Sequence, residues 1–134
     1  MQYIEFGPLG RDSVMPKVLF VCTANLQRSP TAEDLFQNWN GVWHTESAGT
    51  TPFLGRNHLT QQLVDCADLI IVMEPHHAEY IQTHFKTNPG KIKVLNIPDI
   101  YFRNDPELVK ELKNKVTPIL ETWKQSNSEN YPIN

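Results

Sequence analysis

Hydrophobic residues follow two patterns that alternate along the chain. Uninterrupted apolar runs at 18–21 and 69–73, the second within a strand predicted over 68–73, are typical of strands buried on both faces. The segments 42–48 and 91–97 are also predicted as strands, and two lysines at alternate positions place 91–97 near a sheet edge. Between the strands, apolar residues recur at spacings of three and four, which predicts helices over 30–39, 58–67, 74–85 and 106–123. The pattern therefore indicates an α/β protein.

Individual residues refine these helices. Ser29 and Asp105 each precede a proline, so each can cap a helix whose first residue is that proline. Pro118 is expected to kink or interrupt the last helix, because proline lacks the amide that the helix needs. Cys66 falls on the apolar side of the second helix, so we expect a small buried thiol there.

The first apolar run leads directly into a loop that contains a cysteine and an arginine. Residues 17–30 read KVLFVCTANLQRSP, so Cys22 follows the strand and Arg28 precedes the expected helix. Amides at a helix start have no partner within the helix, and loop amides can converge into a nest for an anion. We therefore expect this loop to bind phosphate, with an asparagine bracing it. The expected binding residues are Thr23, Ala24, Asn25, Leu26, Gln27, Arg28 and Ser29.

The same loop can supply a nucleophile. The guanidinium of Arg28 can hold two phosphate oxygens, and its charge favours the thiolate form of Cys22. Ser29 can hydrogen-bond that thiolate and later help it leave a thiophosphate intermediate. A cysteine after a buried strand is often an inert apolar residue, and Cys-x5-Arg alone is common. The full order of strand, cysteine, asparagine, arginine, serine and helix favours the catalytic interpretation.

In these residues the sequence resembles the low-molecular-weight protein tyrosine phosphatase family, whose signature is a cysteine, five residues, then arginine and serine. The resemblance continues through SAGT at 47–50, DLIIVM at 68–73 and IPDIY at 97–101. It implies a three-layer α/β/α fold of the phosphatase I-like type, with a four-stranded parallel sheet in the order 2-1-3-4. It also implies hydrolysis of phosphomonoesters through a cysteinyl-phosphate intermediate, without a metal. The substrate that it implies is phosphotyrosine in a protein, and the sequence leaves a small aryl phosphate open as the alternative.

Two aspartates compete for the role of general acid. Ligands of open parallel sheets bind beyond the carboxyl ends of the strands, so Asp99 should share a rim with Cys22. A carboxylic acid there can protonate the leaving oxygen and then activate water. Asp105 precedes a proline, as the family's acid does, but a helix cap also explains it. The position after the fourth strand favours Asp99.

Aromatic residues near the expected site are candidates for a substrate rim. Phe53 follows the second strand, and Tyr101 and Phe102 follow the predicted acid. These three side chains can pack against an aromatic substrate ring, although core packing by Tyr101 or Phe102 is equally consistent with the sequence.

Composition narrows the partners and the compartment. A chain of 134 residues with 40% hydrophobic and 20% charged residues suits one globular domain. A net charge of −3 without basic clusters disfavours a nucleic-acid partner, and the absence of a long apolar run disfavours a membrane partner. We expect a cytoplasmic protein with an extension at 1–16, the domain at 17–124 and a polar tail at 125–134.

Histidines and cysteines bear on the remaining alternatives. His76, His77 and His84 are not expected to bind a metal, because adjacent residues point to different sides of a helix and no acidic or cysteine partner has ligand spacing. No cofactor is expected either. An arsenate reductase would need further cysteines to relay a disulfide, and Cys66 is the only other one. A non-catalytic phosphate-binding module would need neither a thiolate nor an acid.

Overall fold

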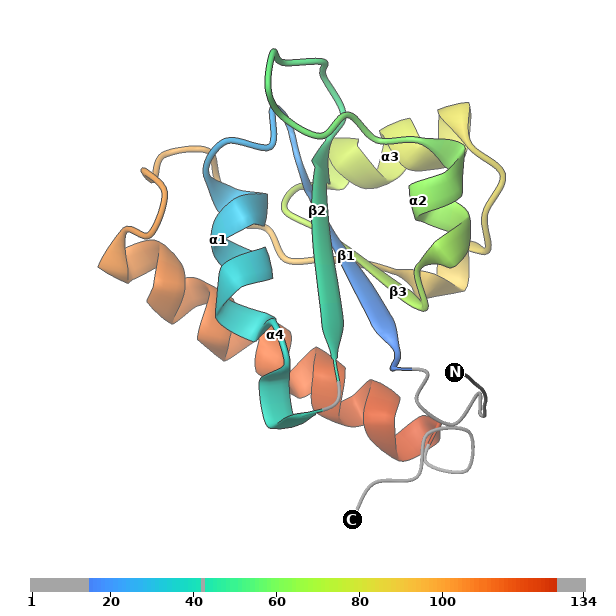
Figure 1. Ribbon diagram of the computed structural model, residues 1–134, viewed down its shortest axis with the longest axis vertical. Helices are drawn as coiled ribbons and strands as arrows, with labels where there is room; N and C mark the ends of the chain where they lie inside the picture. The colour runs from blue at the N-terminus through green and yellow to red at the C-terminus, as the bar shows by residue number, and fades with distance from the viewer. Residues whose placement is uncertain (1–14, 42, 128–134) are drawn as a thin grey trace, which may run out of the picture.

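Four parallel strands form one sheet with helices on both faces in the computed structural model, which describes residues 15–41 and 43–127 (Figure 1). The strands are β1 (Lys17–Cys22), β2 (His44–Gly49), β3 (Leu69–Val72) and β4 (Ile92–Val94). The helices are α1 (Arg28–Phe36), α2 (Gln61–Cys66), α3 (Pro75–His84) and α4 (Pro106–Ser126), with 3-10 turns η1 (Trp39–Gly41) and η2 (Pro89–Lys91). The order β2-β1-β3-β4 confirms the predicted topology and places β4 at an edge.

Alternate side chains of β1 divide the core into two clusters. Val18 and Phe20 belong to a cluster with residues of α1 and α4, whereas Leu19 and Val21 belong to a cluster with residues of α2 and α3. Figure 1 shows α1 and α4 on one side of the sheet and α2 and α3 on the other. Both faces of β1 are therefore buried, which explains its uninterrupted apolar run.

The carboxyl ends of the strands meet at one edge of the sheet. Cys22 at the end of β1 pairs with Gly49 at the end of β2. Beyond β4, Ile97 N donates to Met73 O at 2.8 Å, so the chain continues beside β3 toward the same edge. This pairing brings the segment that follows residue 97 to the end of β1.

The first helix starts two residues earlier than predicted. Thr31 N donates to Gln27 O at 3.2 Å, so α1 begins at Arg28 and Gln27 occupies the N-cap position. The prediction that Ser29 caps this helix is therefore wrong. The hydroxyl of Ser29 instead contacts Cys22 and Asn25, because the first turn of α1 already belongs to the loop.

The second helix starts later than predicted, because the preceding residues continue the sheet. Leu59 N donates to Gly49 O at 2.9 Å, and Thr60 then caps α2 by accepting a hydrogen bond from Leu63 N. Cys66 is exposed, so the prediction of a buried thiol is wrong. The short helix α2 directs Val64, not the cysteine, into the core.

The last helix is continuous. It passes through Pro118, so of the two predicted effects an interruption is wrong and a kink stays a prediction. The helix buries one apolar stripe. Asp105 Oδ1 accepts a hydrogen bond from Glu107 N at 2.9 Å, which confirms Asp105 as the N-cap. Across the described ranges, no helix has the length and apolar character to span a bilayer. Most of the predicted extension and tail, at 1–14 and 128–134, lies outside the described residues.

Candidate active site

A cavity of about 140 Å³ lies where the carboxyl end of β1 meets the start of α1. It brings together the predicted nucleophile Cys22, the predicted phosphate ligand Arg28 and the predicted acid Asp99. Asp105 is not among its lining residues. The full lining consists of Cys22, Thr23, Ala24, Leu26, Gln27, Arg28 and Asp99. We call residues 22–29 the phosphate loop.

Within the phosphate loop, the thiol of Cys22 contacts the hydroxyl of Ser29. Its Sγ lies 3.0 Å from the Oγ of Ser29, and Asn25 Nδ2 donates to the same Oγ at 2.9 Å. The Ser29 hydroxyl also lies 3.5 Å from Ala48 O, at the limit of a hydrogen bond, so the nearer Sγ is the better acceptor for its hydrogen. This arrangement suits a thiolate, which accepts hydrogen bonds and has none to donate.

Asn25 braces the phosphate loop, as expected. Its backbone has a φ of 59°, a left-handed conformation that asparagine tolerates better than most residues. Its Nδ2 donates to Ser47 Oγ at 2.9 Å, and its Oδ1 accepts from Asn57 N at 3.2 Å. Asn25 and Ser29 are both buried and support the loop from behind the cavity.

The residues at the end of β2 pack directly against the phosphate loop. A Cβ on Gly49 would lie 2.6 Å from Thr23 O, so only glycine fits there without displacement of the backbone. Thr50 N donates to Cys22 O at 3.0 Å, and Thr51 N donates to Thr23 O at 2.8 Å. The small side chains at 47–50 allow this close packing.

Arg28 is almost completely buried, with 1% of its surface exposed. Its Nη1 donates to Glu74 Oε1 and to Ile97 O, both at 2.8 Å. Its Nε makes no hydrogen bond to any described residue and lies 3.8 Å from Asp99 Oδ1. A buried N–H without an acceptor is costly, so this donor is suited to an anion in the cavity.

Two site residues after β3 were missed in the sequence. Glu74 holds Arg28, and the buried His77 accepts a hydrogen bond at Nδ1 from Glu74 N at 3.0 Å. The hydrogen of His77 is therefore on Nε2, which lies 2.9 Å from Thr23 Oγ1. Burial lowers the pKa of His77 to about 4, with the charges of His76 and Arg28 acting in the same direction. Both residues follow a buried strand, so the rule that strand ends share one edge would have found them.

The histidines His76 and His77 lie close together, and an acidic residue lies beside them, contrary to the sequence-based prediction. The rings of His76 and His77 have centroids 4.0 Å apart, and the ligand atoms of Glu74, His76 and His77 lie within 4.8 Å of one another. The carboxylate of Glu74 is therefore close enough to both histidines to share a metal ion with them. Its Oε1 is hydrogen-bonded to Arg28, and both nitrogens of His77 are engaged, so these contacts already account for the cluster.

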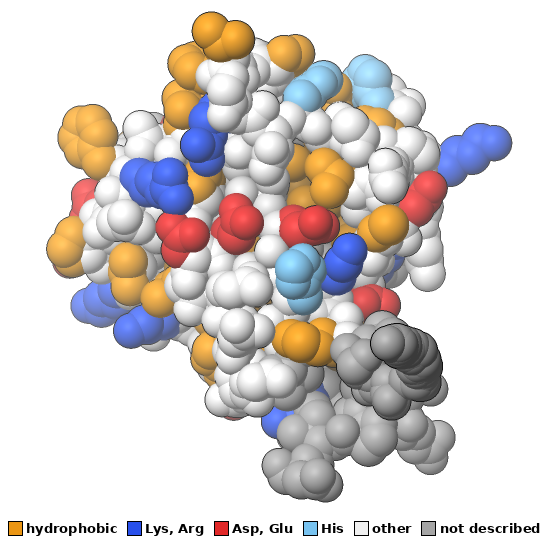
Figure 2. Space-filling view, viewed as in Figure 1, with side chains coloured by type: hydrophobic (Ala, Val, Ile, Leu, Met, Phe, Trp, Pro, Cys, Tyr) orange, Lys and Arg blue, Asp and Glu red, His pale blue; other side chains and the backbone are white. Residues whose placement is uncertain are grey.

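The predicted rim residues are not among the residues that line the cavity. Phe53 and Phe102 are largely exposed, whereas Tyr101 packs partly against the core. Leu54 and Ile100 are exposed beside them in sequence. Figure 2 shows hydrophobic side chains gathered at the top of the molecule, where Figure 1 places the loop after β2.

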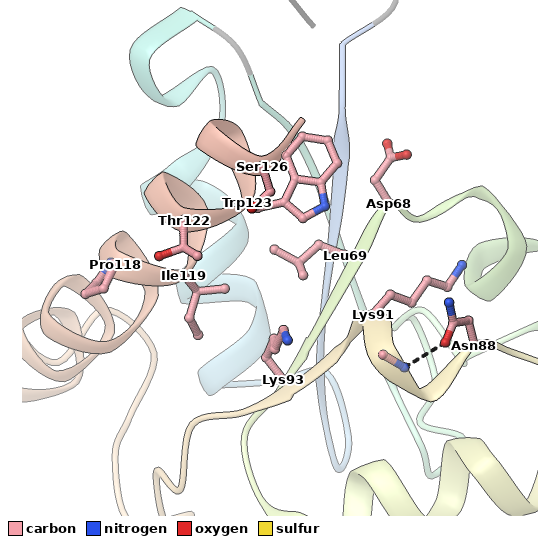
Figure 3. A pocket seen from close by; sticks show the side chains of 11 residues that line it. Asp68, Leu69, Asn88, Lys91, Lys93, Pro118, Ile119, Thr122, Trp123 and Ser126 are labelled. Atoms are coloured by element: carbon pink, nitrogen blue, oxygen red, sulfur yellow. Dashed lines mark hydrogen bonds between the residues drawn. The ribbon is translucent and has the colours of Figure 1, made fainter. Parts of the chain in front are cut away.

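A larger cavity of about 540 Å³ lies at the opposite, amino-terminal edge of the sheet (Figure 3). Leu69 at the start of β3, Ile119 and Trp123 of α4, and the lysines Lys91 and Lys93 line it. It contains no cysteine and no arginine. The smaller cavity at the phosphate loop is therefore the candidate active site.

A parallel α/β/α fold with a cysteine-to-arginine loop after β1 defines the class of cysteine-dependent phosphatases. The family model described as "Low molecular weight phosphotyrosine protein phosphatase" matches residues 17–58. A protein-arginine-phosphatase of Bacillus subtilis is 31% identical over 58% of this chain and 69% of its own length. The low molecular weight protein-tyrosine-phosphatase PtpB of Staphylococcus aureus is 31% identical over 52% of this chain and 64% of its own length.

Solved structures agree on the fold. The tyrosine phosphatase Wzb from Escherichia coli K30, in complex with sulphate, superposes with a TM-score of 0.68 over 82% of this chain and 99% of that chain, at 23% identity. The chain belongs to the low molecular weight phosphotyrosine protein phosphatase family. Its relatives in this family are phosphatases, and Cys22 lies at the position of the family's N-terminal loop. The comparisons do not favour an arsenate reductase or a binding module.

Proposed function

We propose that the protein hydrolyses phosphotyrosine in proteins through a cysteinyl-phosphate intermediate. The observation that carries the proposal is the single small cavity lined by Cys22, Arg28 and Asp99. A nucleophile, a cation and a carboxyl group are the three groups that this reaction needs. No metal takes part in the proposed steps.

The proposed reaction has two steps. The thiolate of Cys22 attacks phosphorus, the bond to the leaving oxygen breaks, and Asp99 gives that oxygen its proton. Water then attacks phosphorus, the sulfur–phosphorus bond breaks, and Asp99 takes a proton from the water. Arg28 and the loop amides hold the phosphoryl oxygens, and the Ser29 hydroxyl stabilises the sulfur as it leaves.

The surroundings of the cavity support an aromatic phosphoester as substrate. Leu26 contributes an apolar side chain to the lining, and Phe53 and Phe102 present exposed rings in the loops after β2 and β4. An aromatic ring gains from apolar contact, whereas the guanidinium of a phosphoarginine needs acceptors. We propose Phe53, Tyr101 and Phe102 as the substrate rim. A cytoplasmic location stays a prediction.

The test is hydrolysis of p-nitrophenyl phosphate and of a phosphotyrosine peptide, with a chelator present, by the wild type and by Cys22→Ser, Asp99→Ala and Asp105→Ala. We expect turnover by the wild type, none by Cys22→Ser, and near-normal turnover by Asp105→Ala. Asp99→Ala should lose about 10²- to 10⁴-fold, as is usual for a general acid. The loss should be larger on phosphotyrosine, because p-nitrophenol leaves more readily without a proton.

A phosphoarginine peptide is the matched comparison for the substrate. Faster turnover of phosphoarginine than of phosphotyrosine would contradict the proposed substrate and leave the mechanism intact. Undiminished turnover by Cys22→Ser would contradict the mechanism itself.

A further inference from the structure

The guanidinium of Arg28 is anchored on one side only. Its Nη1 donates to two acceptors, Glu74 Oε1 and Ile97 O, each at 2.8 Å. Its Nε faces the region of Asp99 at 3.8 Å and makes no hydrogen bond among the described residues. One edge of the group is therefore fixed by the protein, and another is available to a ligand in the cavity that Arg28 lines.

A guanidinium group is planar and rigid, so fixing one nitrogen and the plane fixes the directions of the other N–H groups. With the hydrogen bond to the Ile97 carbonyl alone, the plane of the guanidinium could turn about that single contact. The second contact, from Glu74, removes that freedom. Arg28 is also buried, and without Glu74 its positive charge would lose the carboxylate nearest to it in the protein interior.

We propose that Glu74 is a positioning residue, which orients Arg28 so that its Nε points at the phosphoryl oxygens of the substrate. This inference rests on the proposed function, in which Arg28 holds the phosphate. Glu74 is not among the residues that line the cavity, and its carboxylate contacts Nη1 of Arg28 and not Nε.

Glu74 is well held for this role. Its backbone caps α3 directly after β3, where His77 N donates to Glu74 O at 3.0 Å. Its Oε1 also lies 3.1 Å from His76 Nε2. The hydrogen bond from Arg28 lowers the pKa of Glu74, so the carboxylate stays charged under ordinary conditions.

The experiment measures the binding of inorganic phosphate by calorimetry, in Cys22→Ser as the reference and with Glu74→Ala, Glu74→Gln or Asp105→Ala added. Phosphate has no leaving group, so its affinity reports on Arg28 and not on the acid. We expect Glu74→Ala to weaken phosphate binding at least about tenfold, and to lower kcat/KM about 100-fold in the enzyme with Cys22 intact, as for a misplaced catalytic group. Glu74→Gln keeps an oxygen at the same reach and should stay within about fivefold of the reference.

Asp105→Ala is the matched control, because Asp105 is an acidic N-cap like Glu74 but does not contact Arg28. It should leave phosphate affinity unchanged. Melting temperatures recorded for every variant separate positioning from stability, since a merely structural residue would change the melting temperature and not the affinity of the folded protein. If Glu74→Ala does not fold, Glu74→Asp replaces it: the carboxylate and cap remain, but the reach is shorter by one methylene, and weaker phosphate binding is again expected.

Two results would overturn the inference. The first is that Glu74→Ala binds phosphate as tightly as the reference does. Where Glu74→Asp replaces that variant, the same result in Glu74→Asp counts. The other is a loss in Asp105→Ala as large as in Glu74→Ala. If the wild type turns over and either result is found, the role of Glu74 is rejected and the proposed function stands. A wild type that neither turns over nor binds phosphate rejects the proposed function and this inference together.

Discussion

At the scale of single residues, Gly49 is tightly constrained by the backbone of the phosphate loop. A Cβ there would meet Thr23 O at 2.6 Å and Asn25 N at 2.9 Å, and both are backbone atoms. Backbone atoms cannot rotate away as a side chain can, so any larger residue must displace the loop that carries the nucleophile.

We therefore predict that Gly49→Ala loses at least about tenfold in kcat/KM, because small displacements of catalytic groups are costly. It should also lower the free energy of unfolding by about 1–3 kcal/mol, as overpacking does. Steady-state kinetics and urea titration measure the two effects. Gly90→Ala is the control, since its Cβ would meet only the flexible side chain of Asn88 at 3.1 Å. Equal activity in the two variants would contradict the prediction.

The residues of the phosphate loop could be predicted from the sequence because they are contiguous and each has a distinct chemical type. Glu74 and His77 could not be found in the same way, because their contacts join the start of α3 to a loop that lies some fifty residues earlier in the chain. The exposure of Cys66 was missed for a related reason. Helical periodicity placed Cys66 on the same side as Leu59 and Leu63, but Leu59 precedes α2, and the side chain that α2 buries is Val64.

At the scale of elements, the start of α3 is joined to the phosphate loop by a buried neutral histidine. His77 links Glu74 N to Thr23 Oγ1, and its pKa is lowered to about 4, chiefly by burial. In the unfolded chain a histidine titrates near its ordinary pKa of 6.5. Between these two values the unfolded chain binds a proton that the folded protein does not, so acid favours unfolding.

We predict that the free energy of unfolding falls as the pH decreases from about 6.5 to about 4, with His77 contributing up to about 3 kcal/mol of that fall. His77→Gln cannot titrate, and its amide can still donate to Thr23. The fall with pH should therefore be smaller in this variant by the contribution of His77. Urea titrations of both proteins at several pH values between 4 and 7 measure it. Parallel curves for the two proteins would show that His77 does not titrate in this way.

The strands and their order were predictable because buried parallel strands have the plainest pattern in a sequence. Helix starts were less predictable, because α1 and α2 begin where local hydrogen bonds end the preceding segment. Gln27 O accepts the first bond of α1, and Thr60 Oγ1 caps α2. Both acceptors are polar atoms, so the pattern of apolar residues does not show where these helices begin.

At the scale of the whole molecule, the two core clusters share a single sheet. Ile81 of α3 lies in one cluster and Leu112 of α4 in the other, and both are fully buried. The three tryptophans all lie in or against the cluster that contains Leu112. Because β1 contributes side chains to both clusters, loss of one should unfold the other.

We predict that Ile81→Ala and Leu112→Ala each lower the free energy of unfolding by about 2–5 kcal/mol, as expected for large-to-small changes in a core. Tryptophan fluorescence should report the loss in Ile81→Ala at the same urea concentration as circular dichroism, although no tryptophan belongs to that cluster. Two separate transitions in Ile81→Ala would show that the faces of the sheet unfold independently.

The exposed hydrophobic side chains in the loops after β2 and β4 have a thermodynamic consequence. Phe53, Leu54, Ile100 and Phe102 remain in contact with water when only a small anion occupies the cavity. A larger partner that covers them removes apolar surface from water, and such burial gives a negative change in heat capacity. A phosphorylated protein should therefore bind with a markedly more negative heat-capacity change than inorganic phosphate, even though both place the same anion beside Arg28.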